Sequence, residues 1–290
     1  MTVNKNIFIF GMGYTAQALI KLLVSLDWQV TGTTRIVVQK TARLPQITYI
    51  DYSNQNKAKS HLEKATHLLI SIPPMAEIGD LVLSDYSNCV LEICSNLKWI
   101  GYLSTTGVYG DYQGNWVDET DPTKPNSSRA IARMNAESQW LKLEHVSGIP
   151  VQIFRLAGIY GVGRNAFEQL KKGNYQCVYK PNHYFSRIHV EDIAQVLLAS
   201  MNAPQGGQIY NVSDDMPAPN HEVMAFAAHL LGMETLETVP YECAILSDMA
   251  KDFYTHSRRV CNDKIKKKLG IELKYPSYRE GLSALLKTIR

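Results

Sequence analysis

The stretch Ile7-Phe8-Ile9-Phe10-Gly11-Met12-Gly13-Tyr14-Thr15-Ala16 decides the fold, because it reads as a buried strand, a glycine turn and the start of a helix. Gly11 permits the tight turn, Gly13 permits close approach of the backbone to a pyrophosphate, and Ala16 is small enough for helix–strand packing. The first turn of the helix, with Tyr14 and Thr15, would offer free N–H groups to phosphate. The alternative is a plain strand–turn–helix unit whose glycines serve only the turn.

Further along the chain, strand-like and helix-like segments alternate. We expect strands at residues 6–10, 29–33, 47–51, 67–71, 99–104 and 151–156. Apolar residues at helical spacing predict helices at 16–26 and 81–97, and a third helix at 127–145 ends near Gly148. This order predicts an α/β fold, a Rossmann-type doubly wound parallel sheet.

The strict alternation ends near residue 160, where glycine-rich and proline-containing loops begin. We therefore expect a dinucleotide-binding domain over residues 1–160, to which segments 188–199 and 208–212 return. Residues 161–290 would mostly form a smaller C-terminal lobe on the substrate side, packed by helices at 221–231 and 278–289.

Composition excludes several classes of partner. A net charge of +3 is too small to argue for nucleic acid, and no apolar run approaches the ~20 residues that span a bilayer. The N-terminus reads as a strand rather than a signal peptide. Five cysteines without Cys-x-x-Cys pairing favour free thiols in a reducing compartment and give no metal site. We expect a cytoplasmic monomer or homodimer with a small-molecule substrate.

One basic cluster, at residues 264–268, has two interpretations. It is either a phosphate-binding patch or, as we expect, the solvated face of a short helix that Gly270 ends.

Several blocks together resemble a known family. They are Tyr102-Leu103-Ser104-Thr105-Thr106-Gly107-Val108-Tyr109-Gly110, the prolines Pro122 and Pro125, Glu137 on the following helix, and Arg155-Leu156-Ala157-Gly158-Ile159-Tyr160-Gly161. In this order they are similar to the extended short-chain dehydrogenases/reductases. The blocks at 258–262 and 274–282 resemble its bacterial YeeZ-like subgroup, which carries an NAD-dependent epimerase/dehydratase label. Fold alone does not fix the reaction.

The resemblance implies a catalytic frame with a substitution in it. Thr105 would hydrogen-bond the reacting carbonyl or hydroxyl, and the family's Tyr-x-x-x-Lys falls on Arg129 and Arg133. Arginine stays protonated near neutral pH and cannot cycle a proton. Arg133 would clamp ribose or phosphate, and Arg129 would bind a substrate anion or polarise an oxyanion. The structural alternative pairs Arg133 with Glu137, and Arg129 with acidic residues of the preceding loop, which are Asp118, Glu119 and Asp121.

Three other side chains are candidates for the missing proton donor: Tyr109, Tyr160 and His189. Tyr109 is the best of them, and the histidine of this block is more often structural. Nucleotide-sugar members place a phosphate-binding Arg four residues before that histidine, where this chain has Phe185 and, two residues later, Arg187. This difference weakens a nucleotide-sugar assignment.

The residues that follow the second strand determine the preference between NAD and NADP, and an NAD site would have an acidic residue there. The chain has Thr33, Thr34 and Arg35 instead, which suits the 2′-phosphate of NADP and favours NADP over NAD. Arg35 can also simply end a strand in solvent. By resemblance, Asp51 and Tyr52 would lie near the adenine. The segment Ser71-Ile72-Pro73-Pro74 would line the adenine and nicotinamide ribose.

These observations predict an NAD(P)-binding oxidoreductase or epimerase/dehydratase that acts on a small, anionic substrate. The alternative is a non-catalytic NADP-binding sensor or scaffold that kept the fold after losing the tyrosine. A third interpretation, a structural protein that binds no nucleotide, requires Met12 or Tyr14 to block the glycine turn.

Overall fold

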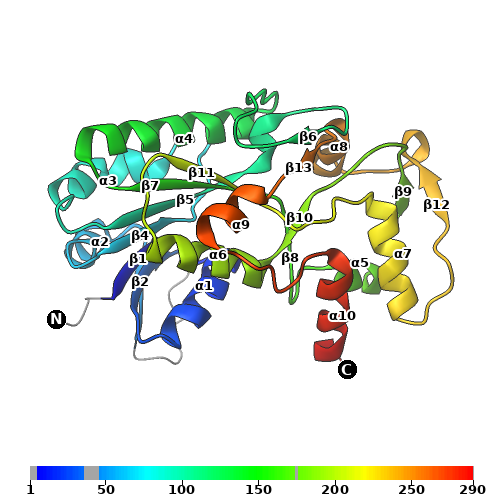
Figure 1. Cartoon of the computed structure of the whole chain (residues 1–290), viewed down its shortest axis with the longest axis horizontal. Coiled ribbons are helices and arrows are strands. Elements are labelled where there is room, and N and C mark those ends of the chain that lie inside the picture. The colour runs from blue at the N-terminus through cyan, green and yellow to red at the C-terminus, as the bar shows by residue number, and fades with distance from the viewer. Residues whose placement is uncertain (1–4, 36–45, 174–175, 290) are drawn as a thin grey trace.

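A parallel seven-stranded sheet forms the centre of the protein, as the computed structural model shows (Figure 1); it describes residues 5–35, 46–173 and 176–289. The strand order is β11 (Gln208–Val212), β7 (Val151–Leu156), β5 (Trp99–Thr105), β4 (His67–Ile70), β1 (Asn6–Phe10), β2 (Gln29–Thr34) and β3 (Ile47–Asp51). All neighbours pair in parallel. The predicted doubly wound α/β fold is therefore confirmed. The strand order reverses between β1 and β4, and ligands of such sheets bind at that point.

The alternation of side chains along β1 explains why helices cover both faces of the sheet. Ile7 and Ile9 enter the core beneath α1 (Tyr14–Val24) and α6 (Val190–Asn202). Phe8 and Phe10 enter the opposite core, beneath α2 (Gln55–Leu62), α3 (Leu81–Glu92) and α4 (Ser128–Ser147). A strand buried on both faces reads as the continuous apolar run seen in the sequence.

The predicted helix at 81–97 is too long. It ends at Glu92, with Ile93 as its C-cap, although Leu97 is still buried in the core. Ser95 and Asn96 lie in the intervening turn, and the side chains of such residues compete for backbone groups and favour turns over helix. By contrast, β5 runs one residue further than predicted, to Thr105, because that residue still pairs with Leu156 of β7.

A smaller group of elements lies beside the sheet (Figure 1). Its helices α5 (Ala166–Lys171), α7 (Asn220–Leu230) and α10 (Tyr278–Ile289) pack around a core that contains Phe167, Tyr278 and Leu282. The strand pair β9 (Cys177–Tyr179) and β12 (Thr238–Pro240), the short η2 (Tyr241–Cys243) and α8 (Asp248–Thr255) complete this part. Helices α7 and α10 correspond to the two late helices predicted from the sequence.

Two short parallel pairs connect this part to the sheet. β8 (Gly158–Tyr160) pairs with β10 (Arg187–His189), and β6 (Trp116–Val117) pairs with β13 (Arg259–Val260). Helix α9 (Asp263–Leu269) follows β13, and Gly270 ends it at a φ of 65°. Within the described residues, no group of His, Cys, Asp or Glu is arranged to hold a metal, and no helix is both long and apolar enough to cross a membrane.

Candidate active site

The glycine turn has the shape that a dinucleotide requires. Gly11 has a φ of +90°, and a Cβ atom there would lie 2.8 Å from Cγ1 of Ile72, so only glycine fits the turn. Gly13 differs, because a Cβ atom there would meet nothing within 4 Å. Gly13 also caps α1 without any side-chain hydrogen bond to the first turn. The N-terminus of α1 therefore faces open space with its own N–H groups, which fits a pyrophosphate.

Thr33 does not face the open space at the N-terminus of α1, so its predicted contact with a 2′-phosphate is wrong. Its side chain is fully buried, and its hydroxyl oxygen accepts the amide hydrogen of Gly11 at 3.1 Å. Thr33 therefore holds the glycine turn in place. Thr34 is half-buried at the end of β2, and Arg35 is exposed immediately after it.

The other predicted cofactor residues lie at the carboxyl ends of β3 and β4. The Asp51 carboxylate accepts hydrogen bonds from the amide and hydroxyl of Ser53, which lower its pKa. The Tyr52 hydroxyl donates to Asp85 at 2.8 Å and so fastens α3 to this edge. Ile72 and Pro74 are half-buried and Pro73 is exposed. Ser71 joins Thr15 in lining the cavity described next.

A cavity of about 830 Å³ runs from the N-terminus of α1, across the ends of β5 and β7, into the smaller part of the protein. It brings together Thr15, Ser71, Thr105, Arg129 and Arg133, which are far apart in the sequence. Five arginines line it in all: Arg129, Arg133, Arg164, Arg187 and Arg258. None of the lining residues is Asp, Glu or Lys within the described parts of the chain. We call it the arginine-lined cavity.

Thr105 is placed to donate a hydrogen bond into this cavity. It caps the 3-10 turn η1 (Thr106–Tyr109), and its Oγ1 accepts the amide hydrogen of Gly107 at 3.1 Å. The turn therefore fixes the side chain and leaves its hydroxyl hydrogen free for a substrate oxygen.

Arg133 does not pair with Glu137, so the structural alternative for Arg133 does not hold. Its Nη1 donates to the carbonyl oxygen of Leu103 at 2.6 Å and to the Tyr102 hydroxyl at 3.5 Å. Glu137 is buried instead between Ser104, whose hydroxyl donates to it, and Arg155, whose Nη2 lies 2.8 Å from Oε2. β7 provides the partner because it lies directly beside β5 in the sheet.

Arg129 is exposed on the first turn of α4, at the edge of the arginine-lined cavity. The predicted pairing with the acidic loop does not form, since those carboxylates bind elsewhere. Asp118 accepts from Thr120, Asp121 from the amide of Asp118, and Glu119 from the amide of Asn211. Over the described ranges, the Arg129 guanidinium has no hydrogen-bond or ion-pair partner, so it is available to an anion.

The predicted alternative proton donors are engaged in the fold. Tyr109 does not face the cavity, contrary to expectation, because it is fully buried, its hydroxyl donates to Asn211 at 2.8 Å and Arg155 covers its ring. The Tyr160 hydroxyl donates to the carbonyl oxygen of Ser277. His189 caps α6 by accepting the amide hydrogen of Glu191, and burial lowers its pKa to about 4.

Two arginines of the cavity were not predicted. Arg164 closes a turn with Gly161, and its guanidinium lies 5.9 Å from the ring of Tyr14, beside the N-terminus of α1. The glycine-rich segment before it was the available signal. Arg258 donates from Nη1 to the carbonyl oxygen of Gly110 at 2.7 Å. The sequence could not place Arg258 at the cavity, because its partner Gly110 lies 148 residues away.

Comparisons with known proteins agree with this geometry. Residues 7–213 match the model of the NAD dependent epimerase/dehydratase family. The chain is 29% identical to Protein YeeZ of Escherichia coli strain K12, over 94% of this chain and 97% of that protein. It is 27% identical to a 3-diazoavenalumate denitrifying reductase from a Streptomyces species, over 58% of this chain and 55% of the reductase.

Solved structures share the fold of this chain. A functionally unknown conserved protein from Silicibacter pomeroyi DSS is 43% identical and superposes with a TM-score of 0.91 over 99% of both chains. The dTDP-glucose 4,6-dehydratase of Bacillus anthracis, solved with NAD, has a TM-score of 0.79 at 16% identity, over 97% of this chain and 95% of the dehydratase. The chain therefore belongs to the NAD-dependent epimerase/dehydratase family of extended short-chain dehydrogenases/reductases, whose members bind NAD(P).

Proposed function

We propose that this protein binds NADP at the glycine turn and oxidises or reduces a small anionic substrate in the arginine-lined cavity. The observation that carries the proposal is the lining itself. It joins the N-terminus of α1 to Thr105 in one space and contains five arginines and no carboxylate among its described residues. Low-dielectric walls of one charge sign concentrate ligands of the opposite sign.

The cofactor, when bound, supplies or accepts a hydride. In the direction of reduction, the Thr105 hydroxyl donates to the substrate carbonyl oxygen and holds it beside the end of β5. The unpaired Arg129 guanidinium stabilises the negative charge that develops on that oxygen. Because Arg129 cannot release a proton, the alkoxide takes its proton from water at the open edge of the cavity. Arg133, fixed to Leu103, holds the ribose or a phosphate.

The preference for NADP rests on Arg35 and Thr34, since Thr33 is buried. An Arg35→Ala variant should bind NADPH about tenfold more weakly and NADH unchanged, because only NADPH has the 2′-phosphate. Fluorescence titration of both nucleotides measures this. Lys142→Ala, which removes an exposed cation from the far part of α4, is the matched control. An unchanged NADPH/NADH ratio in Arg35→Ala would remove the argument for NADP.

Catalysis is tested by incubating the NADPH complex with a library of oxo and hydroxy acids while NADPH absorbance is followed. For a compound that is turned over, Arg129→Gln should lower kcat about 100-fold with little change in the Kd of NADPH. An Arg129→Gln enzyme that is as fast as the wild type would refute the role of Arg129.

A second candidate function is a non-catalytic NADP-binding sensor. It is favoured by the replacement of the Tyr-x-x-x-Lys pair by Arg129 and Arg133 and by the burial of Tyr109. Tight NADPH binding without turnover of any library compound supports the sensor, and absence of binding to either nucleotide rejects both functions.

A further inference from the structure

The wall of the arginine-lined cavity changes character in the smaller part of the protein. There the lining includes the apolar and aromatic side chains of Phe185, Val223, Leu246, Phe253, Tyr254 and Leu282, beside the polar side chains of Gln169, Gln176 and Asn220. The Tyr254 ring lies edge-on to Phe185 at 5.3 Å and stacked on His183 at 5.4 Å, so the surface is a packed aromatic cluster. Phe253 from α8 is 61% exposed and also lines the cavity. We call this surface the aromatic wall.

An exposed phenyl ring in a cavity wall offers an apolar contact, because a ligand that covers it removes apolar surface of both partners from water. A group that turns only polar or charged atoms toward these rings would gain less, because covering the rings would remove water from those atoms. The aromatic wall therefore suits an apolar or aromatic body.

One cation, Arg258, lies between the aromatic wall and the reacting end of the cavity. Its Nη1 is held by the carbonyl oxygen of Gly110, the C-cap of η1, whose N-cap is Thr105. Its Nε is buried and has no hydrogen-bond partner among the residues that the structure describes. Burial lowers the pKa of Arg258 to about 10, which still leaves the guanidinium charged at neutral pH.

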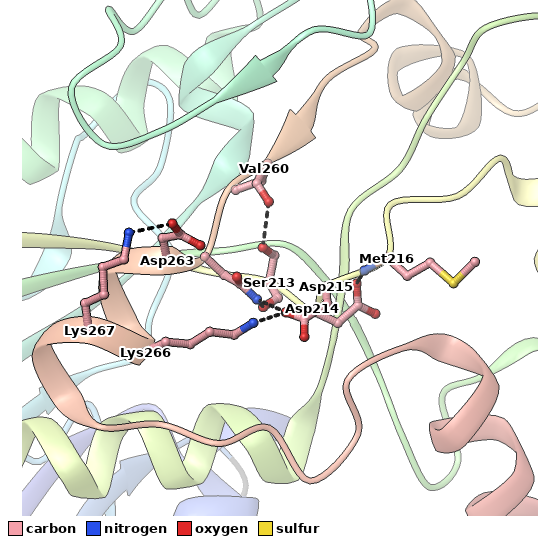
Figure 2. A network of polar contacts seen from close by, with 9 residues as sticks. Ser213, Asp214, Asp215, Met216, Val260, Asp263, Lys266 and Lys267 are labelled. Atoms are coloured by element: carbon pink, nitrogen blue, oxygen red, sulfur yellow. Dashed lines mark hydrogen bonds and ion pairs between the residues drawn. The ribbon is translucent and has the colours of Figure 1, made fainter.

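The position of Arg258 is fixed by its neighbours in the chain. β13 begins at the next residue and pairs with β6. Figure 2 shows how the segment after it is held: the Ser213 hydroxyl donates to the Val260 carbonyl oxygen, and Lys266 pairs with Asp215 at 2.6 Å. Asp111 is the acidic residue whose charge acts on Arg258, but its Oδ1 accepts the amide hydrogens of Gln113 and Ser257 rather than the guanidinium.

The other arginine at this end is already used. Arg187 donates to the carbonyl oxygens of Phe185 and Ala218 and to the side chain of Asn220, which braces the loop before α7. Arg258 is therefore the arginine beside the aromatic wall that can bind a ligand, and one guanidinium matches one carboxylate in a charge-assisted pair.

We infer that the substrate is a small amphiphilic acid, in which Arg258 binds a single carboxylate, the aromatic wall packs an apolar or aromatic body, and Thr105 holds the reacting oxygen. This inference rests on the proposed function for the role of Thr105.

Calorimetric titration of the NADPH-loaded protein with four probes tests the inference. Phenylpyruvate has the carboxylate, carbonyl and aromatic body; its methyl ester lacks the charge; pyruvate lacks the body; UDP-glucose has a diphosphate and sugars. Phenylpyruvate should bind about 10- to 100-fold more tightly than the ester, which loses a charge-assisted hydrogen bond, and more tightly than pyruvate. Equal binding of acid and ester, or tighter binding of UDP-glucose, would overturn the inference.

Two variants assign the two parts of the site. Arg258→Gln should weaken phenylpyruvate by the same 10- to 100-fold and leave the ester unchanged. Phe253→Ala should weaken the acid and the ester equally, and Lys142→Ala should affect neither. If Arg258→Gln does not fold, the series of four probes on the wild type still decides.

The same titrations without NADPH separate this inference from the proposed function. Phenylpyruvate binding to a protein that binds neither nucleotide leaves the substrate class standing and rejects the proposed function. NADPH binding with no discrimination among the four probes rejects the substrate class and leaves the proposed function standing.

Discussion

At Gly13 the backbone is open to space, and this is where we propose that the pyrophosphate binds. A Cβ atom there would be free of contacts, whereas at Gly11 it would meet Ile72. Two glycines that are two residues apart therefore have different surroundings: the turn requires Gly11, and the open space at Gly13 supports its proposed contact with the cofactor.

This difference predicts opposite behaviour of two alanine variants. Gly13→Ala should unfold at the same urea concentration as the wild type, because its φ of −84° suits alanine, but it should bind NADPH at least about tenfold more weakly. Gly11→Ala should be destabilised by about 1–3 kcal/mol, because of its positive φ and the contact with Ile72. Urea titration and NADPH titration of both variants measure this. Normal NADPH affinity in Gly13→Ala would place the pyrophosphate elsewhere.

Glu137 is the second residue with a decisive environment. It is 3% exposed, with its charge matched by Arg155 on β7. Glu137→Gln should lower the free energy of unfolding by about 3–5 kcal/mol, since it leaves Arg155 buried without its counter-charge. The double variant Glu137→Met/Arg155→Met should be less destabilised than the single variant, because neither charge remains. A cost below about 1 kcal/mol for Glu137→Gln in urea titration would show that solvent reaches Arg155.

At the scale of elements, the cap of α6 links stability to pH. His189 accepts the first-turn amide of Glu191 only while it is neutral, and burial lowers its pKa from 6.5 to about 4. The unfolded chain therefore binds the extra proton first, and this contribution to stability is present above pH 6.5 and is lost as the pH falls toward 4.

His189→Asn keeps a capping oxygen but does not titrate. Between about pH 6 and about pH 5, its free energy of unfolding should therefore fall less than that of the wild type, by up to about 1.4 kcal/mol per pH unit. Identical slopes for His189→Asn and the wild type would show that His189 does not titrate in this range.

The sequence predicts the helices and strands better than it predicts which side chains contact one another. Local patterns define β1, β3 and β7, since apolar runs bounded by turn residues determine where a strand begins and ends. The cap at Ser127 and the left-handed Gly148 similarly fix α4. The partner of Glu137 could not be predicted in this way, because Arg155 reaches it through the order of strands and not through helical spacing.

At the scale of the whole molecule, the same limit applies to the site. The cofactor turn follows from ten consecutive residues, whereas the arginine-lined cavity combines α1, β5, α4 and a segment beyond residue 250. The resemblance to the family predicts that Arg129 and Arg133 belong to the site, but it does not predict their hydrogen-bond partners. Arg164 has only the glycine-rich segment before it as a local signal and Arg258 has none, because their neighbours Tyr14 and Gly110 lie far along the chain.

The pairing of β6 with β13 has a consequence for the order in which the molecule is built. Synthesis proceeds from the N-terminus, and the glycine turn can form once β1, α1 and β4 have left the ribosome. The cavity beside it needs β13, which ends at Val260, 190 residues after the end of β4 at Ile70. While these intervening residues are being synthesised, the chain therefore has the elements of the proposed dinucleotide site but not yet those of the proposed substrate site.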